Sequence, residues 1–230
     1  DSVIEIFRED LARFRILISD PSDDVRALDL VEQGKVPELR ALRLHNGTVY
    51  RWNRPIYDPG EDLPNLRLEN RLLPVGPTVV DTVANAAFFF GLVRMIRTAD
   101  RPLWSRLAFK SAADNFINCA KQGLEATVYW PGIGDIPVVE LIIRHLLPLA
   151  AEGLADLRVA PDLIDRYMEI LRSRAQTEQN GANWQIKTLR LLEAGGLDRP
   201  AALAEMTRQY SHNMHTNEPV HTWPVEGAAG

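Results

Sequence analysis

The sequence predicts an α+β fold in which a partial antiparallel sheet precedes a mainly helical bundle. Residues 48–54 are predicted to form a strand because they are rich in β-branched and aromatic residues. Residues 66–73 are predicted to form a second strand because apolar and charged residues alternate along them. From residue 77 onward, apolar residues recur at helical spacing almost to the end. We therefore expect a helical segment (1–44), two strands of a larger sheet (45–76), a helical region (77–210) and a tail (211–230).

The first helix is predicted from Ile4, Phe7, Leu11, Phe14 and Ile18, with a stop at the turn-forming residues 20–23. A short helix is plausible between residues 27 and 42. The Asn46-Gly47 pair then predicts a turn before the first strand, and a loop at 57–65 joins it to the second. Because two strands alone cannot form an independent sheet, further strands are expected from elsewhere.

Thr78, followed three residues later by Asp81, resembles a capping box and predicts a long helix to about Thr98. Further helices are predicted at 102–126, 136–152, 161–177, 182–194 and 200–210. The segment Gly132-Ile133-Gly134 has two of the three glycines of a dinucleotide-binding loop and no clear preceding strand. The sequence therefore does not predict dinucleotide binding at this segment.

Composition excludes several classes of protein. The 230 residues carry a net charge of −5, which argues against a nucleic-acid binder. The single cysteine, Cys119, excludes an internal disulfide framework and favours a reducing, cytoplasmic location. The longest apolar run, residues 86–93, is far shorter than the roughly 20 residues of a membrane span, so no membrane partner is expected. The chain begins with Asp1 rather than Met, so we expect either that the start was trimmed or that these residues are part of a longer protein.

The second strand has two unlike faces. Alternation places Leu66, Leu68 and Leu72 on one side, and the charged residues Arg67, Glu69 and Arg71 on the other. Two interpretations of the charged side stay open. It is either a solvated face with cross-strand ion pairs, or the wall of a cleft in which a carboxylate binds a cation and guanidinium groups bind phosphate or carboxylate.

Other chemistry-bearing residues each have a functional and an ordinary interpretation. Depending on the register, Arg51 or Arg54 of the first strand would lie near Glu69. His45 and Asn46 are either ligands or plain hydrogen-bonding residues at a turn. Metal binding by three tail histidines ranks last, and Cys119 is expected to be a small core residue. The histidines in question are His212, His215 and His221, with Glu218 nearby.

Three motifs in order resemble the glutamate–cysteine ligase and carboxylate–amine ligase family. An aromatic strand ends in Arg54-Pro55, a second strand carries Glu69-Asn70-Arg71, and the run from Pro77 to Asp81 opens an alanine-rich helix. Weaker likenesses follow at residues 114–124 and 179–185. The resemblance covers residues 45–210.

The resemblance implies a glutamine-synthetase-like catalytic sheet and an ATP-dependent reaction through an acyl phosphate. The γ-carboxylate of glutamate would be joined to an amine such as cysteine, with ATP and Mg²⁺ as cofactors. Glu69 would bind the magnesium ion, and Arg54 and Arg71 would act in catalysis. The resemblance further implies an amino-terminal half with the remaining strands, and a homo-oligomer is possible. Substrate or nucleotide binding is assigned to Arg51, Trp52, Arg67, Asn115 and Lys121.

The chain departs from the family at several positions. Pro74 stands where an Asp is common, Asn53 and Asn70 replace hydrophobic or acidic residues, and Asn118 and Lys121 replace an arginine-rich helix face. These departures indicate a divergent branch. The alternative function is therefore a non-catalytic relative, or a helical interaction module whose charged strands serve assembly.

Overall fold

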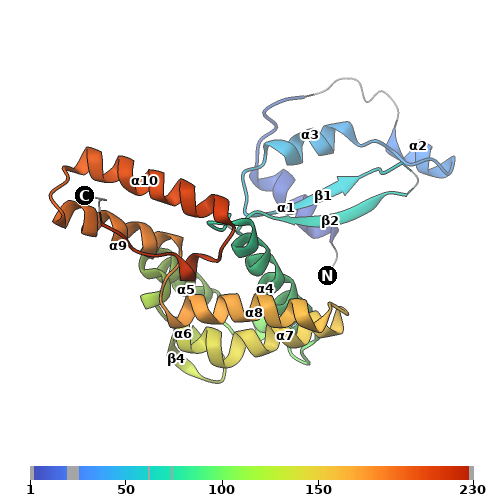
Figure 1. The fold of residues 1–230 in the computed structure, drawn as a ribbon. Coiled ribbons are helices and arrows are strands. Elements are labelled where there is room, and N and C mark those ends of the chain that lie inside the picture. The colour runs from blue at the N-terminus through green and yellow to red at the C-terminus, as the bar shows by residue number, and fades with distance from the viewer. Residues whose placement is uncertain (1–2, 20–25, 62, 74, 228–230) are drawn as a thin grey trace. The chain divides into compact units, whose positions relative to one another are not determined.

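A computed structural model of the protein describes residues 3–19, 26–61, 63–73 and 75–227. The chain divides into two compact units, Asp1–Pro74 and Val75–Gly230, which are described separately (Figure 1). Within the described residues, helices predominate and each unit holds one antiparallel pair of strands. The α+β class predicted from the sequence is confirmed.

The first unit contains three helices and a pair of strands: α1 (Ile4–Arg13), α2 (Ala27–Glu32), α3 (Arg40–Thr48), β1 (Asn53–Asp58) and β2 (Asn65–Asn70). The helix expected to continue to Ile18 ends at Arg13, and Phe14 is extended. Ile16, Leu17 and Ile18 are exposed, so no packing would hold further helical turns. The expected stop at residues 20–23 and the departure at Pro74 lie outside the described residues.

The first strand begins later than predicted. Residues 46–48, expected as a turn and the start of a strand, form the last turn of α3, and β1 begins at Asn53. Figure 1 shows α3 lying along β1, and Asn46 donates from Nδ2 to the Pro55 carbonyl (3.0 Å). Packing against the strand therefore overrides the β-propensity of Thr48. The second strand was predicted to continue to residue 73 but ends at Asn70. There the side-chain oxygen of Asn70 accepts a hydrogen bond from the Leu72 N–H (3.2 Å).

The second unit is mainly helical. Its elements are α4 (Val79–Thr98), α5 (Phe109–Gln122), β3 (Thr127–Trp130), β4 (Gly134–Pro137), α6 (Val138–Leu141), α7 (Leu147–Asp156), α8 (Pro161–Gln176), α9 (Gly181–Ala194) and α10 (Arg199–Thr216). A π-helical turn, Ile142–Leu146, connects α6 to α7. As predicted, Thr78 caps α4 by accepting a hydrogen bond from the Asp81 N–H (3.1 Å).

Helices α4 and α7 approach each other at two glycines. A Cβ atom on Gly91 would overlap the Ala150 carbonyl, and one on Gly153 would overlap the Gly91 carbonyl. Leu147, Leu154 and other buried residues pack around this crossing, with α8 against it. Only glycine at both positions allows the two backbones to meet so closely.

Among the described residues, α4 alone is long and apolar enough to cross a membrane, and only 22% of its most apolar stretch is buried inside the structure. The uninterrupted apolar run in the sequence, residues 86–93, is shorter than α4 because Asn85 and Arg94 bound it on either side. One such helix is weak evidence for a membrane span, since core helices of soluble proteins and signal sequences meet the same criteria. Helix α4 packs against α7 and α8 on one side, and most of its apolar stretch is exposed.

A hairpin occupies residues that were predicted as loop and helix. Strands β3 and β4 pair antiparallel through a turn in which Gly132 and Gly134 have positive φ angles (82° and 95°). Val128 and Ile136 are buried beside Leu141. The predicted helix at 102–126 is therefore reduced to α5 and two short 3₁₀ turns, and the one at 136–152 begins at Val138.

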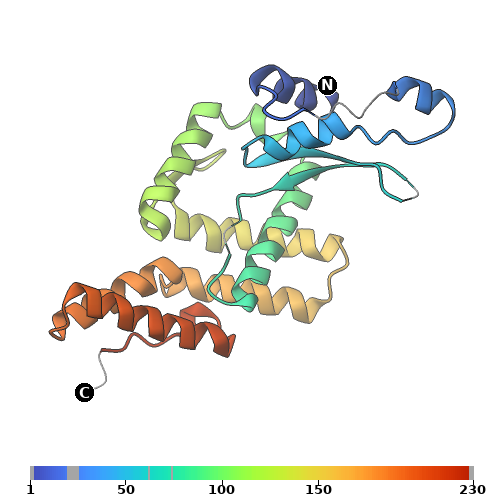
Figure 2. The same ribbon diagram turned by 90° about the horizontal axis from the view of Figure 1, so that it is seen from above.

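Residues 217–225 pack onto the second unit instead of forming a tail. Helix α10, predicted to end at 210, continues to Thr216 beside α9 (Figure 2). Val220 and Trp223 are buried with Trp184, and the Trp184 Nε1–H donates to the Pro224 carbonyl (2.8 Å). Aromatic edge-to-face contacts between Trp184, Tyr210 and Trp223 fix this segment.

Candidate functional site

The charged face of the β1–β2 sheet brings three of the predicted site residues together. In the observed register Arg54 lies opposite Glu69, Ile56 opposite Arg67, and Asp58 opposite Asn65. Because alternate residues share a face, Arg54, Arg67 and Glu69 lie on one side of the sheet with Asp58. The register selects Arg54 rather than Arg51 as the partner of Glu69.

Arg54 is the most heavily bonded of these residues. Its Nε and Nη2 donate to Oε2 of Glu69 at 2.8 and 2.6 Å. Its Nη1 donates to the carbonyls of Asn46, Gly47 and Val49 at 3.2 to 3.4 Å. These carbonyls lie at or just past the carboxyl end of α3, so Arg54 caps that helix and complements its dipole. With 12% of its side chain exposed, Arg54 is a positioning residue that ties α3 to both strands.

Arg67 forms the second cross-strand ion pair. Its Nη1 donates to Oδ2 of Asp58 (2.8 Å), and this hydrogen bond lowers the pKa of the exposed Asp58 carboxyl. Asp58 and Arg67 line an open pocket of about 180 Å³ together with Arg43 and Tyr57. The Tyr57 hydroxyl donates to the Pro37 carbonyl (2.7 Å), and partial burial raises its pKa. The pocket therefore presents two guanidinium groups, each with an ion-pair partner: Arg67 with Asp58, and Arg43 with Glu38 (2.9 Å).

Arg51 is engaged elsewhere in the first unit. It forms an ion pair with Asp10, which is only 1% exposed, and its guanidinium lies over the Phe14 ring, 5.9 Å from the centroid. These contacts hold α1 against the segment that follows α3. Trp52 and Arg71 flank the paired strands with exposed side chains, and the Arg71 N–H donates to the Trp52 carbonyl (2.7 Å).

Asn115 and Lys121 belong to the second unit. Asn115 Nδ2 donates to the Tyr129 carbonyl and Oδ1 accepts from the Tyr129 N–H, both at 2.8 Å. The side-chain amide thus pairs with β3 as another strand would. Lys121 lies exposed in the last turn of α5. Asn115 therefore has a structural task that residue spacing could not indicate.

His45 and Asn46 are buried structural residues of α3. His45 Nε2 contacts the Phe14 carbonyl (3.1 Å), so this nitrogen carries the proton. Cys119 is half-buried near Val128, and burial raises the pKa of its thiol, which agrees with the expected core role. Over the described residues, no group of three His, Cys, Asp or Glu side chains could hold a metal ion, the tail histidines included.

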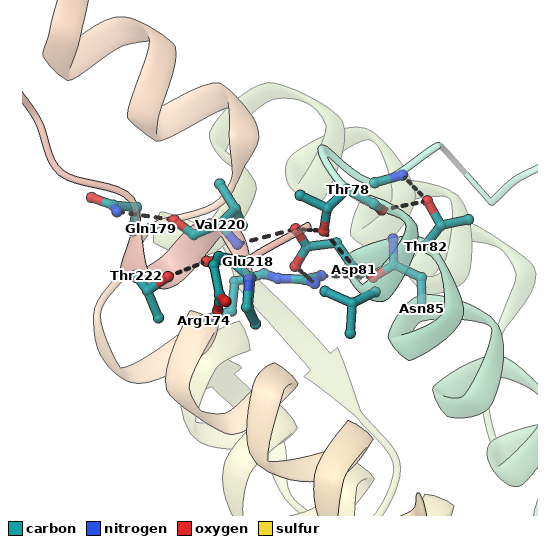
Figure 3. A network of polar contacts seen from close by, with 12 residues as sticks. Thr78, Asp81, Thr82, Asn85, Arg174, Gln179, Glu218, Val220 and Thr222 are labelled. Atoms are coloured by element: carbon teal, nitrogen blue, oxygen red, sulfur yellow. Dashed lines mark hydrogen bonds and ion pairs between the residues drawn. The ribbon is translucent and has the colours of Figure 1, made fainter. Parts of the chain in front are cut away.

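A buried polar cluster in the second unit was not predicted (Figure 3). Asp81 is fully buried and accepts from Arg174 Nη2 (2.6 Å), the Thr78 hydroxyl (2.8 Å) and the Val220 N–H (3.1 Å). Arg174 Nη1 also donates to Asn85 Oδ1 (2.7 Å). The cluster joins the start of α4, the end of α8 and the carboxy-terminal segment. Sequence reasoning recognised Asp81 only as a residue of the helix cap.

Gln179 and His221 complete the attachment of that segment. Gln179 Nε2 donates to the carbonyls of Val220 (3.1 Å) and Trp223 (2.9 Å). Burial is the main cause of a lowered pKa of His221, and the nearby Arg174 adds to it, while Asp81 acts in the opposite direction. The His221 imidazole is thus held in its neutral form more strongly than a free histidine.

Comparison with known proteins leaves the site to be interpreted from its own geometry. No family model matches the chain, and no curated protein or solved structure matches it either. The residues that sequence reasoning missed are Asp58 on the charged face and Arg43 of α3, which lines the adjacent pocket. Asp58 lies four residues after Arg54 in β1, so the two side chains share a face of the sheet. The strand was predicted to end at residue 54, and Asp58 was therefore not among the predicted site residues.

Proposed function

We propose that this chain is the carboxy-terminal part of an ATP-dependent ligase that forms an amide between a carboxylate, the γ-carboxylate of glutamate, and an amine such as cysteine. One observation supports this most strongly. The arginine of the Arg-Pro motif and the glutamate of the Glu-x-Arg motif are direct cross-strand neighbours, with Arg54 and Glu69 joined at 2.6 Å. Two short motifs 15 residues apart thus converge on one face.

Arg67 and Arg43 are the residues of this unit best placed to bind an anionic group. A pocket of about 180 Å³ suits one phosphate or carboxylate group, whereas a whole drug-sized ligand requires roughly 300–1,000 Å³. In the proposal these guanidinium groups hold the reacting end of a substrate. Arg54 fixes the direction of Glu69, and Arg71, exposed at the strand end, is free to approach a larger ligand.

ATP and Mg²⁺ belong to the proposal through the family resemblance. The first unit offers Glu69 and Asp58 as carboxylates on the charged face, each already ion-paired with an arginine. Among the described residues, no group of three His, Cys, Asp or Glu side chains could hold a metal ion without further ligands. Since Mg²⁺ commonly takes one or two carboxylates together with substrate phosphates, Glu69 would supply one oxygen.

The remaining partners follow from the same proposal. Glutamate and an amine are the small-molecule substrates, and an amino-terminal half supplies further strands of the sheet. A cytoplasmic location suits a chain with one unpaired thiol and a reaction that consumes ATP.

The test uses this chain combined with the proposed amino-terminal half. ADP release that depends on glutamate and an amine should fall roughly 100-fold in Glu69→Gln, because the substitution removes a charge from the reacting site. The matched control is Glu61→Gln, an exposed glutamate in the loop between the strands, which should leave turnover unchanged. Unaltered turnover in Glu69→Gln, or no substrate-dependent ADP release at all, would refute the proposal.

A second candidate is a non-catalytic relative whose strands serve assembly. The observation in its favour is that the charged face consists of two ion pairs, Arg54 with Glu69 and Arg67 with Asp58, as in a solvated sheet face. Calorimetric titration of the combined protein with Mg-ATP separates the two functions. A ligase gives saturable binding heat, and a scaffold gives none.

A further inference from the structure

The two edges of the β1–β2 sheet differ in their ability to accept another strand. The Arg71 N–H donates to the Trp52 carbonyl, which makes Trp52 and Arg71 a hydrogen-bonded pair. In an antiparallel ladder such pairs alternate with pairs whose backbone groups point outward. The intervening pairs in this register are Asn53 with Asn70, Pro55 with Leu68, and Tyr57 with Leu66.

The outer edge of β1 is closed. Pro55 is one of its outward-facing residues and has no N–H to donate, and Pro59 follows the end of the strand. The Pro55 carbonyl already accepts a hydrogen bond from Asn46 of α3 (3.0 Å). Prolines and a covering helix are devices that prevent edge-to-edge pairing.

The outer edge of β2 is open. Leu66, Leu68 and Asn70 direct their backbone N–H and C=O groups away from β1, and no strand among the described residues pairs with them. The side chains of Leu66 and Leu68 are 52% and 59% exposed. An unpaired edge flanked by exposed leucines is a template for another strand.

The charges on β2 identify the strand that fits this edge. We propose that β2 pairs with β2 of a second copy of this chain, antiparallel about a two-fold axis at Leu68. In this register Arg67 lies opposite the partner's Glu69, and Glu69 lies opposite the partner's Arg67. Moving the axis to Arg67 or to Glu69 would place identical charges opposite each other, which is destabilising, whereas the axis at Leu68 pairs unlike charges. An axis at Asn70 would also pair unlike charges, Glu69 with the partner's Arg71, but it would bring residues 71–73, which lie beyond the end of β2, opposite the partner's strand.

The proposed pairing satisfies the backbone as well as the charges. Leu68 and the partner's Leu68 form a hydrogen-bonded pair, and Leu66 forms another with the partner's Asn70. Arg67 and the partner's Glu69 then form the closer, non-hydrogen-bonded pair. The result is a four-stranded sheet with a shared leucine face, which exceeds the two strands that are marginal alone. Since both outer edges are closed by β1, assembly stops at two copies.

The experiment measures the mass of the full chain by sedimentation equilibrium over a range of concentrations. The wild type should form a dimer of twice 25.9 kDa. Arg67→Glu alone and Glu69→Arg alone should each be monomeric, because each places like charges opposite each other. An equimolar mixture of these two variants should recover the dimer. Arg71→Glu, the same change of charge at a position opposite the partner's uncharged Asn65, should remain dimeric.

Recovery of the dimer by mixing shows that both variants are folded, because only folded strands can pair in this way. A wild type that is monomeric at every concentration would overturn the proposal and would leave this edge for a different strand. A dimer that survives both single substitutions, or a mixture that stays monomeric, would overturn it equally. The dimer is proposed for this chain by itself, because further strands from the proposed amino-terminal half would have to pair with the same open edge of β2.

Discussion

Replacing Arg174 by Met tests the buried cluster of the second unit. The substitution keeps most of the aliphatic stem and removes the guanidinium that binds Asp81 at 2.6 Å. Asp81 is fully buried and Arg174 is 13% exposed, so the remaining carboxylate has little access to water. Removing one partner of a buried ion pair costs about 3–5 kcal/mol. Because Thr78 and Val220 still donate to Asp81, we expect about 3 kcal/mol.

Urea unfolding followed by far-UV circular dichroism and tryptophan fluorescence measures this loss. Trp184 and Trp223 are buried in the second unit and report on the attached carboxy-terminal segment. With a slope of about 2 kcal/mol per molar urea, a loss of about 3 kcal/mol lowers the unfolding midpoint by about 1.5 M. The double variant Asp81→Asn/Arg174→Met should be more stable than the sum of its single changes predicts.

Arg172→Met is the matched control on the same helix. Arg172 lies 3.5 Å from Glu169 in an ion pair that is 36% and 64% exposed, so its loss should cost under about 1 kcal/mol. Equal losses for Arg174→Met and Arg172→Met would refute the assignment of the buried pair as a stabilising link.

Two further predictions concern single residues in each unit. Arg54→Met should destabilise the first unit by about 2 kcal/mol, since charge-assisted bonds to Glu69 and the cap of α3 are lost, and Trp52 fluorescence monitors this. An unchanged midpoint would contradict the capping role of Arg54. Because burial lowers the pKa of His221, the native state binds fewer protons than the unfolded state, and the free energy of unfolding should fall as pH drops below about 6.5. His221→Gln should make the free energy of unfolding less dependent on pH, whereas His215→Gln, at an exposed position, should not. Equal pH slopes for the wild type and His221→Gln would contradict this prediction.

Local signals in the sequence located some elements well. The Thr78 cap and the apolar run behind it gave the start and end of α4, because capping is decided by residues within one turn. Alternation correctly placed Arg67 and Glu69 on one face, since the pleat alone determines this.

Properties that depend on distant residues could not be predicted. Whether Arg51 or Arg54 meets Glu69 depends on a register set by α3 and Pro55, and Arg51 instead pairs with Asp10, 41 residues away. The β3–β4 hairpin, in contrast, depends on local residues: Gly132 and Gly134 have positive φ, and this turn signal could have predicted the hairpin from the sequence. Of the two interpretations left open for the charged face, the cross-strand ion pairs are present, and ligand binding there is still a proposal.

The Asp81 cluster also bears on how the chain folds during synthesis. Asp81 and Val220 are separated by 139 residues. At about 5–20 residues per second, the ribosome needs roughly 7–28 seconds to deliver the Val220 amide after Asp81 has been made. Through this interval α4 carries a carboxylate without its full set of donors, and its glycine crossing with α7 forms beside an unfinished end. We therefore expect the buried cluster of the second unit to be completed only after the segment around Val220 has been made.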